Sequence, residues 1–310
     1  MQTILGAGGP IGIDLAKALK NNGHSNIRLV SRNTKKVNDS DELFPADLTN
    51  RQQVLDAIKD SEIVYVTIGF PYQLKVWQAL WPPFIKNVID GCEQHKAKLV
   101  FFDNVYIYDK DEIPHQTEES KINPPSEKGK VRANVAKQIT DAYKSGRIGA
   151  LIARSADFYG PLGTDRSVLM SLVYNAIKSG RGPNWLKAMD MPHSFTYTPD
   201  AAKAVAILGN KPEAYNQVWH LPTHRGLTGE EWISLVSETM GKKKKGSVMP
   251  KFMMTVLGWF IPEMREFPEM LYQYDQEYFF DSSKFEQAFP DFKITTPEEG
   301  VKQTIKILQA

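Results

Sequence analysis

The sequence predicts an α/β protein with a doubly wound parallel sheet and a smaller, mostly C-terminal lobe. The chain opens with an apolar run that ends at Leu5 and leads into a glycine-rich turn and an amphipathic segment with helical spacing. Short apolar runs rich in β-branched residues then alternate with helical patterns, which is typical of parallel strands buried between two layers of helices. The 310 residues are enough for one large domain or two closely joined domains.

Glycines stand at four positions of the turn that follows the first strand. A turn that passes close to a phosphate must lack side chains, and the helix after it must point its free N–H groups at the anion. The common G-x-G-x-x-G fingerprint would need a glycine where Ile11 stands. The sequence therefore predicts a Rossmann-type nucleotide-binding turn of another spacing, although a purely structural turn is the alternative. The cofactor contacts expected from it are Gly6, Gly8, Gly9, Pro10, Ile11 and Gly12.

The second predicted strand, residues 26–31, bears on the choice of cofactor. It ends about 20 positions past the glycine turn, where a dinucleotide-binding fold places the residue that reads the adenosine ribose. An acidic residue there favours NAD, but this chain has Arg32, whose guanidinium suits a 2′-phosphate. The sequence thus favours NADP over NAD, unless Arg32 is only a solvated turn residue.

The rest of the chain continues the alternation of predicted strands and helices. The residues Thr67, Ile68 and Gly69, after a β-branched run, are expected to close over the cofactor toward its nicotinamide. A proline and an acid after Thr198 favour a helix start there, and Thr228 with Glu231 forms a capping-box pattern. We predict strands at residues 43–48, 62–69, 149–154 and 217–222, and a strand with its exit loop at 98–108. Helices are expected at residues 50–60, 74–95, 126–145 and 166–180.

The composition excludes several classes of function. With 42% hydrophobic and 24% charged residues and a net charge of +2, the chain has no electrostatic footprint for nucleic acid. The most apolar stretch, residues 252–261, is far shorter than the roughly 20 residues of a membrane span. The single Cys92 cannot form an internal disulfide and, like His95, has no partner at metal-ligand spacing. We expect a cytoplasmic protein without a metal that binds neither nucleic acid nor membranes.

These motifs resemble the extended short-chain dehydrogenase/reductase superfamily, which includes NAD-dependent epimerases and dehydratases. Gly6-x-x-Gly9-x-x-Gly12 looks like its glycine pattern, Ile107-Tyr108-Asp109 like its Val-Tyr-Gly, and Arg154 to Pro161 like its Arg-x-x-x-x-Tyr-Gly-Pro turn. The resemblance implies a Rossmann domain over residues 1–160, completed by roughly 192–220, and a mainly substrate-binding lobe over 161–310. It also implies that Asp47 and Leu48 lie against the adenine, and that a homodimer forms through the helices at 74–95 and 126–145.

The chain departs from this superfamily at its catalytic positions. The Tyr-x-x-x-Lys pair, in which the lysine assists a proton-transferring tyrosine, is replaced by Lys128 and Arg132, and the catalytic Ser/Thr position falls on Asn104. Arg132 would keep the ribose contact, and Asn104 would orient a substrate oxygen. Lys128 could move the proton only as a neutral amine, a state that burial and the nearby Arg132 favour. The alternatives are that Lys128 is an exposed lysine and that Tyr106 or Tyr108 supplies a phenol.

The C-terminal lobe offers weaker signals. His193 would line the substrate cleft or cap a strand, and Asp200 has a sufficient role at its helix start. Residues 247–280 are rich in Met and aromatic residues, and form either the core of this lobe or an apolar substrate wall. Such a wall would favour a phenyl, flavonoid-like or other apolar carbonyl compound over a nucleotide sugar.

Two functions follow from the sequence. The first is an NADP-dependent oxidoreductase or epimerase-like enzyme with an atypical catalytic site, acting on a small carbonyl or hydroxyl compound. The second is a non-catalytic NADP-binding sensor or interaction protein of the same fold. The missing tyrosine weakens the first hypothesis, and the retained substrate lobe weakens the second.

Overall fold

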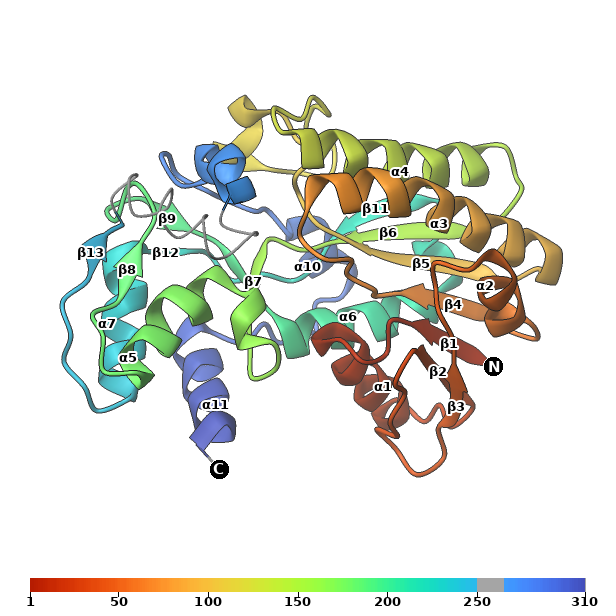
Figure 1. Ribbon diagram of the computed structural model, residues 1–310, viewed down its shortest axis with the longest axis horizontal. Coiled ribbons are helices and arrows are strands. Elements are labelled where there is room, and N and C mark those ends of the chain that lie inside the picture. Colours follow the sequence, from red (N-terminus) through yellow and green to blue (C-terminus); the bar gives the residue numbers. More distant parts are fainter. Residues whose placement is uncertain (250–264, 310) are drawn as a thin grey trace. The chain divides into compact units, whose positions relative to one another are not determined.

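The computed structural model describes residues 1–249 and 265–309 and confirms the predicted fold class. Its centre is a seven-stranded sheet in the order β11-β6-β5-β4-β1-β2-β3, in which every neighbouring pair is parallel (Figure 1). The order reverses between β1 and β4, where a doubly wound sheet opens its ligand crevice. The strands are β1 (Gln2–Leu5), β2 (Ile27–Ser31), β3 (Glu42–Pro45), β4 (Ile63–Val66), β5 (Lys98–Asp103), β6 (Ala150–Arg154) and β11 (Gln217–His220).

The helices that accompany this sheet cover both of its faces. In Figure 1, α3 and α4 lie together on one side of the sheet, and α1 and α6 lie on the other. Close packing of α2 against α3 depends on Gly91, because a Cβ there would lie 3.0 Å from the Ile58 side chain. The helices are α1 (Pro10–Asn21), α2 (Arg51–Ile58), α3 (Leu74–His95), α4 (Glu127–Lys144) and α6 (Thr198–Gly209). A short helix, η4 (Pro212–Ala214), precedes β11.

The chain divides into two compact units. Unit 1 comprises residues 1–107, 128–154 and 201–221, and contains the whole central sheet. Unit 2 comprises residues 108–127, 155–200 and 222–310. The chain therefore crosses between the units several times. The division expected from the sequence, residues 1–160 completed by roughly 192–220 and a lobe over 161–310, stays a prediction.

Unit 2 is built from short strand pairs and helices around an aromatic core. The core includes Tyr159, Trp185, Phe195 and Trp232. The strand pairs are β7 (Asp157–Tyr159) with β10 (Phe195–Tyr197), β9 (Pro192–His193) with β12 (Leu227–Thr228), and β8 (Asn184–Trp185) with β13 (Ser247–Val248). The helices are η1 (Lys110–His115), η2 (Thr164–Arg166), η3 (Met170–Asn175), α5 (Ala176–Lys178), α7 (Gly229–Thr239), η5 (Phe267–Gln273), α10 (Ser283–Ala288) and α11 (Pro297–Gln309).

The single helix predicted over residues 166–180 is wrong in its details. Ser167 has extended backbone angles, and its hydroxyl accepts from Met170 N, so the helix begins only after it. The following segment, η3, is a π-helix that continues into the three residues of α5. The apolar spacing of this stretch suits either kind of turn, and the sequence pattern could not distinguish them.

The expected helix starts in unit 2 agree with the structure. Thr228 is the N-cap of α7, and both hydrogen bonds of the capping box with Glu231 are present. Asp200 lies in the first turn of α6 and accepts a hydrogen bond from Thr295 N at 2.7 Å, which accounts for its burial. Within the described residues, no helix is long and apolar enough to cross a membrane.

The Met- and aromatic-rich stretch is only partly described. Met249, Leu271 and Tyr274 form a small buried cluster with Leu186. Phe252, Met253, Met254, Trp259, Phe260 and Met264 lie outside the described residues. The expected apolar wall stays a prediction.

Candidate functional site

The glycine turn after β1 packs tightly against the end of β4. Gly6 has φ +98°, and a Cβ on it would lie 2.5 Å from Ile68 Cα. A Cβ on Gly12 would lie 2.8 Å from Ala7 Cα and 3.0 Å from the Thr67 hydroxyl oxygen. These two glycines are therefore required for packing between the two loops, before any ligand is considered.

The other two glycines leave space beside the turn. A Cβ on Gly9 would come no closer than 3.4 Å to another atom, and one on Gly8 no closer than 3.6 Å, to the Ser31 hydroxyl. Gly9 is the N-cap of α1, where no side chain caps the helix and no acid stands in the first turn. The first N–H groups of a helix have no intrahelical acceptor, so those of Ile11 and Gly12 suit an anion. This side-chain-free cradle fits the pyrophosphate of a dinucleotide.

The structure brings the other predicted cofactor residues to the ends of neighbouring strands. Thr67 and Ile68 contact the glycine turn, whereas Gly69 is exposed beside them. Leu48 is buried, and Asp47 is exposed and accepts two hydrogen bonds from Thr49, which lower the pKa of its carboxyl group. The sequence analysis assigned no role to Ser31. Its position as the last residue of β2 could have indicated that its hydroxyl lies beside the glycine turn, near Gly8.

Arg32 is an exposed residue directly after β2. Its positive charge contributes to the lowered pKa of Asp47. Because Arg32 is exposed, its guanidinium is accessible to a ligand phosphate. The negative charge of Asp47 is near enough to Arg32 to interact with it, and would repel such a phosphate.

Arg132 lies in a buried cluster at the carboxyl ends of β5 and β6. Its Nε donates to Asp103 Oδ1 at 2.9 Å, and its Nη2 donates to the same oxygen. Arg154 Nε lies 3.4 Å from the other carboxylate oxygen of Asp103. All three side chains are buried. The predicted ribose contact of Arg132 stays a prediction, since the structure gives its guanidinium a carboxylate partner within unit 1.

Aromatic rings surround this ion pair. The guanidinium carbon of Arg132 lies 4.3 Å from the Trp81 ring centroid and 4.9 Å from that of Phe101. The Trp77 ring lies next along α3, with its centroid 6.0 Å from the same carbon. Such stacking needs a planar cation, which explains an arginine at this position better than a lysine.

Lys128 is fully buried, so the interpretation of it as an exposed lysine is wrong. It stands one turn before Arg132 on α4, and its Nζ lies 4.6 Å from the ring centroid of Tyr72. Tyr72 lies in the loop between β4 and α3, and sequence reasoning missed it. A tyrosine and a lysine are thus neighbours in space, although the tyrosine is 56 positions from the place where the superfamily has one.

Asn104 and Tyr106 follow β5 closely. The side-chain oxygen of Asn104 accepts from Tyr106 N at 3.2 Å, which leaves its amide nitrogen as the group that can donate to a ligand oxygen. The Tyr106 ring stacks on Trp77 with centroids 6.4 Å apart. The predicted catalytic residues Asn104, Tyr106, Lys128 and Arg132 therefore lie within unit 1, whereas the alternative phenol Tyr108 is buried in unit 2.

His193 takes part in a polar cluster within unit 2. Its Nε2 lies 3.0 Å from Asp157 Oδ2, and the Tyr274 hydroxyl donates to the same oxygen. The imidazole stacks on Tyr274 and on Tyr278, at centroid distances of 4.5 and 4.2 Å. Burial raises the pKa of Tyr278. The sequence indicated His193 but gave no sign of Asp157 and Tyr274 as its partners.

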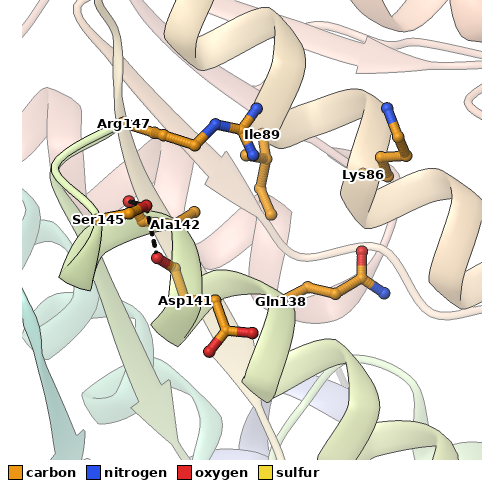
Figure 2. A pocket seen from close by; sticks show the side chains of 7 residues that line it. All are labelled: Lys86, Ile89, Gln138, Asp141, Ala142, Ser145 and Arg147. Carbon is orange, nitrogen blue, oxygen red and sulfur yellow. Dashed lines mark hydrogen bonds between the residues drawn. The ribbon is translucent and has the colours of Figure 1, made fainter.

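A groove of about 300 Å³ lies between α3 and α4. Figure 2 shows Lys86 from α3 on one side, Asp141 from α4 on the other, and Arg147 beyond the end of α4. Arg147 precedes β6 and so lies toward the amino ends of the strands, away from the glycine turn. The predicted homodimer would bury these charges, each of which is already paired within the chain: Lys86 with Asp90, Asp141 with Lys137, and Arg147 with Glu93. Dimerisation stays a prediction.

No metal centre is found within the two described stretches, 1–249 and 265–309. No three of their His, Cys, Asp and Glu side chains are placed to hold an ion. Cys92 is buried, and burial raises the pKa of its thiol, so it is an inert core residue.

The reversed strand order, the side-chain-free turn and the open N-terminus of α1 together define a fold of the Rossmann type, the class in which dinucleotides bind at such a turn. The model of the NAD dependent epimerase/dehydratase family matches residues 3–219. The chain belongs to this family. No curated protein matches its sequence.

Solved structures of similar fold span the whole chain. UDP-N-acetylglucosamine 4-epimerase from Bacillus cereus is 16% identical, with a TM-score of 0.77, and the match covers 100% of this chain and 99% of that one. UDP-glucose 4-epimerase from Thermus thermophilus, in complex with NAD, is 17% identical with the same TM-score and coverage. dTDP-glucose 4,6-dehydratase from Streptomyces venezuelae, with NAD bound, is 12% identical, with a TM-score of 0.79 and coverage of 100% and 97%. At these identities the likeness shows the fold alone.

Proposed function

We propose that this protein is an NADP-dependent oxidoreductase that acts on a small carbonyl or hydroxyl compound through an atypical catalytic site. The observation that carries the proposal is the glycine turn, which needs Gly6 and Gly12 for packing but keeps open space beside Gly9 at the uncapped N-terminus of α1. Space that no protein atom uses, beside free N–H donors, suits a phosphate better than a structural turn.

The preference for NADP depends on Arg32. It is exposed directly after β2, where the residue that reads the adenosine ribose is expected. A guanidinium favours a 2′-phosphate through paired, charge-assisted hydrogen bonds. Four solved structures of similar fold hold NAD, but their identities to this chain, 12% to 17%, are too low to carry that preference over.

The catalytic residues proposed for unit 1 are Asn104, Lys128, Arg132 and a tyrosine. The nicotinamide ring of the cofactor supplies or accepts a hydride. The Asn104 amide nitrogen donates to the substrate oxygen, because the amide oxygen already accepts from the Tyr106 backbone. Lys128 moves the proton, either itself or through the adjoining phenol of Tyr72 or of Tyr106. Arg132 keeps α4 in place through Asp103 and reaches the ribose only if it gives up part of that pair.

Calorimetric titration with NADPH and, separately, with NADH tests the cofactor assignment. We expect wild type to bind NADPH at least about tenfold more tightly than NADH, a difference of about 1.4 kcal/mol. Arg32→Ala should remove that preference without weakening NADH binding. Lys35→Ala, which removes another exposed cation three residues further along, is the control and should keep the preference. Binding of neither cofactor overturns the proposal, and a preference for NADH overturns the role of Arg32.

A non-catalytic NADP-binding sensor is the second candidate. The observation that favours it is the commitment of Arg132 to Asp103, which makes the family's lysine position part of a core. An enzyme should oxidise NADPH with at least one compound of a carbonyl panel, and Lys128→Met should abolish this activity. A sensor should bind NADPH tightly and show no turnover with any member of the panel.

A further inference from the structure

Two indole N–H donors in unit 1 are buried and find no acceptor among residues 1–249 and 265–309. Trp77 and Trp81 stand one turn apart on α3, with exposed fractions of 6% and 2%. Within the described part of the chain, neither Nε1 has a hydrogen-bond partner. Buried indole N–H groups normally find an acceptor, so two neighbouring exceptions require an explanation.

The surroundings of these indoles are aromatic and cationic. Trp77 packs edge-on against Tyr72 and stacks on Tyr106, with centroid distances of 5.4 and 6.4 Å. Trp81 packs edge-on against Phe70 at 4.9 Å and carries the Arg132 guanidinium on its face. The carboxylate nearest to them, that of Asp103, already accepts from Arg132. The described residues therefore leave both indole N–H groups without an acceptor.

The loop that borders this cluster is less buried than the indoles. Ile68, Phe70 and Tyr72, between β4 and α3, are half-buried, and Gly69 is exposed. The same loop contacts the glycine turn through Ile68. A ligand that approaches over this loop would meet flat rings first and indole N–H groups behind them.

We propose that Trp77 and Trp81 form a substrate subsite for a planar, apolar compound that carries a carbonyl group. The rings of Trp77, Tyr72 and Tyr106 provide stacking surface, and the indole N–H groups donate to the carbonyl oxygen. The subsite deepens the proposed function, on which it rests for its place in the reaction. It assigns the aromatic preference to unit 1, whereas the sequence suggested residues 247–280 of unit 2.

Two phenols test the subsite. They differ at one side-chain carbon, which is a carbonyl in one compound and a methylene in the other. Para-hydroxyacetophenone and para-ethylphenol have the same ring and hydroxyl group, but only the ketone offers a carbonyl acceptor. Calorimetry on wild type, with and without NADPH, should show the ketone binding about tenfold more tightly. Trp77→Phe and Trp81→Phe keep a ring but remove a donor, and each should reduce the ketone preference several-fold while para-ethylphenol binding changes little.

Trp219→Phe is the matched control. Its indole N–H already donates to Ala214 O at 2.8 Å, so the ketone preference should stay at the wild-type ratio. In wild type, the ketone should also shift the indole N–H resonances of Trp77 and Trp81, whereas para-ethylphenol should leave them in place. Because these resonance shifts are measured on the wild type, they test the subsite even if a variant fails to fold.

The outcomes separate this inference from the proposed function. Equal binding of the two phenols, or no binding of either, overturns the subsite. An unchanged preference in both Phe variants overturns it as well, and would indicate that the indole N–H groups point at neighbouring rings. A chain that binds NADPH but fails these tests retains the proposed function. A chain that shows the ketone preference without binding NADPH retains the subsite and loses the oxidoreductase proposal.

Discussion

Alanine substitutions in the glycine turn should separate folding from cofactor binding. Gly9 has φ −86° and ψ 163°, which any residue adopts, and an added Cβ would come no closer than 3.4 Å to another atom. Alanine removes about 0.4–1 kcal/mol of unfolded-chain entropy, which offsets its similar disadvantage against glycine as an N-cap. We expect Gly9→Ala to leave the free energy of unfolding within about 0.5 kcal/mol of wild type.

Gly12→Ala should have the opposite effect. Its Cβ would lie 2.8 Å from Ala7 Cα and from Gly6 O, which are backbone atoms that cannot rotate away. Because both contacts are with backbone, overpacking should cost the upper part of its usual range, about 2–3 kcal/mol, against about 1 kcal/mol of improved helix propensity. We expect the free energy of unfolding to fall by about 1–2 kcal/mol.

Urea denaturation and calorimetric titration with NADPH measure the two effects on the same preparations. Gly9→Ala should lose about tenfold in affinity, close to 1.4 kcal/mol, because its methyl group would occupy the space assigned to the pyrophosphate. Gly149→Ala is a control for both measurements, since its Cβ would make only ordinary contacts of 3.7 and 3.9 Å. Unchanged NADPH binding by Gly9→Ala would refute the placement of the pyrophosphate on this turn, and a fully stable Gly12→Ala would refute the packing argument.

Three further predictions concern stability. Burial raises the pKa of Asp14 above 3.8, so the folded state binds more protons than the unfolded state in that window and stability falls as the pH rises through it. Asp14→Asn should therefore stabilise the protein at neutral pH, with the gain lost below about pH 4 in thermal denaturation. Arg132→Leu removes the closest partner of the buried Asp103 and should cost about 3 kcal/mol in urea denaturation, whereas a loss under about 1 kcal/mol would contradict the ion pair. Thr228→Ala removes the capping box of α7 and should cost about 1 kcal/mol, with Thr228→Ser close to wild type.

The sequence predicted most of the fold because the sheet is buried on both faces. Parallel strands covered by helices appear as short apolar runs, and the six runs predicted after the first strand each overlap a strand of the sheet, with ends differing by a few residues. The long helix at 74–95 was predicted with its observed bounds. The short strand pairs of unit 2 were harder to predict, because two- and three-residue strands have too little periodicity to detect.

The candidate site was predictable where a single position decides the chemistry. Gly6 and Gly12 are constrained by backbone geometry, so their spacing alone indicated the turn. Tyr72 and the unpaired indoles of Trp77 and Trp81 gave no comparable signal. Their importance comes from contacts with residues that lie elsewhere in the chain, and an aromatic residue at helical spacing most often belongs to a core. Only the structure could show that Tyr72 lies beside Lys128.

The changes at the catalytic positions depend on one another. In the register expected from the sequence, Arg132 stands at the lysine position of the family's pair and Asp103 precedes its serine or threonine position. The structure places Asp103 and the Trp81 ring against the Arg132 guanidinium. Only a planar cation can both donate twice to Asp103 and stack on an indole, so these three residues form one unit. Restoring the family's residues with Lys128→Tyr and Arg132→Lys would leave Asp103 without its paired donors and Trp81 without its stacked cation. We therefore expect that double variant to lose stability rather than to gain activity, because the surroundings of the pair have changed along with it.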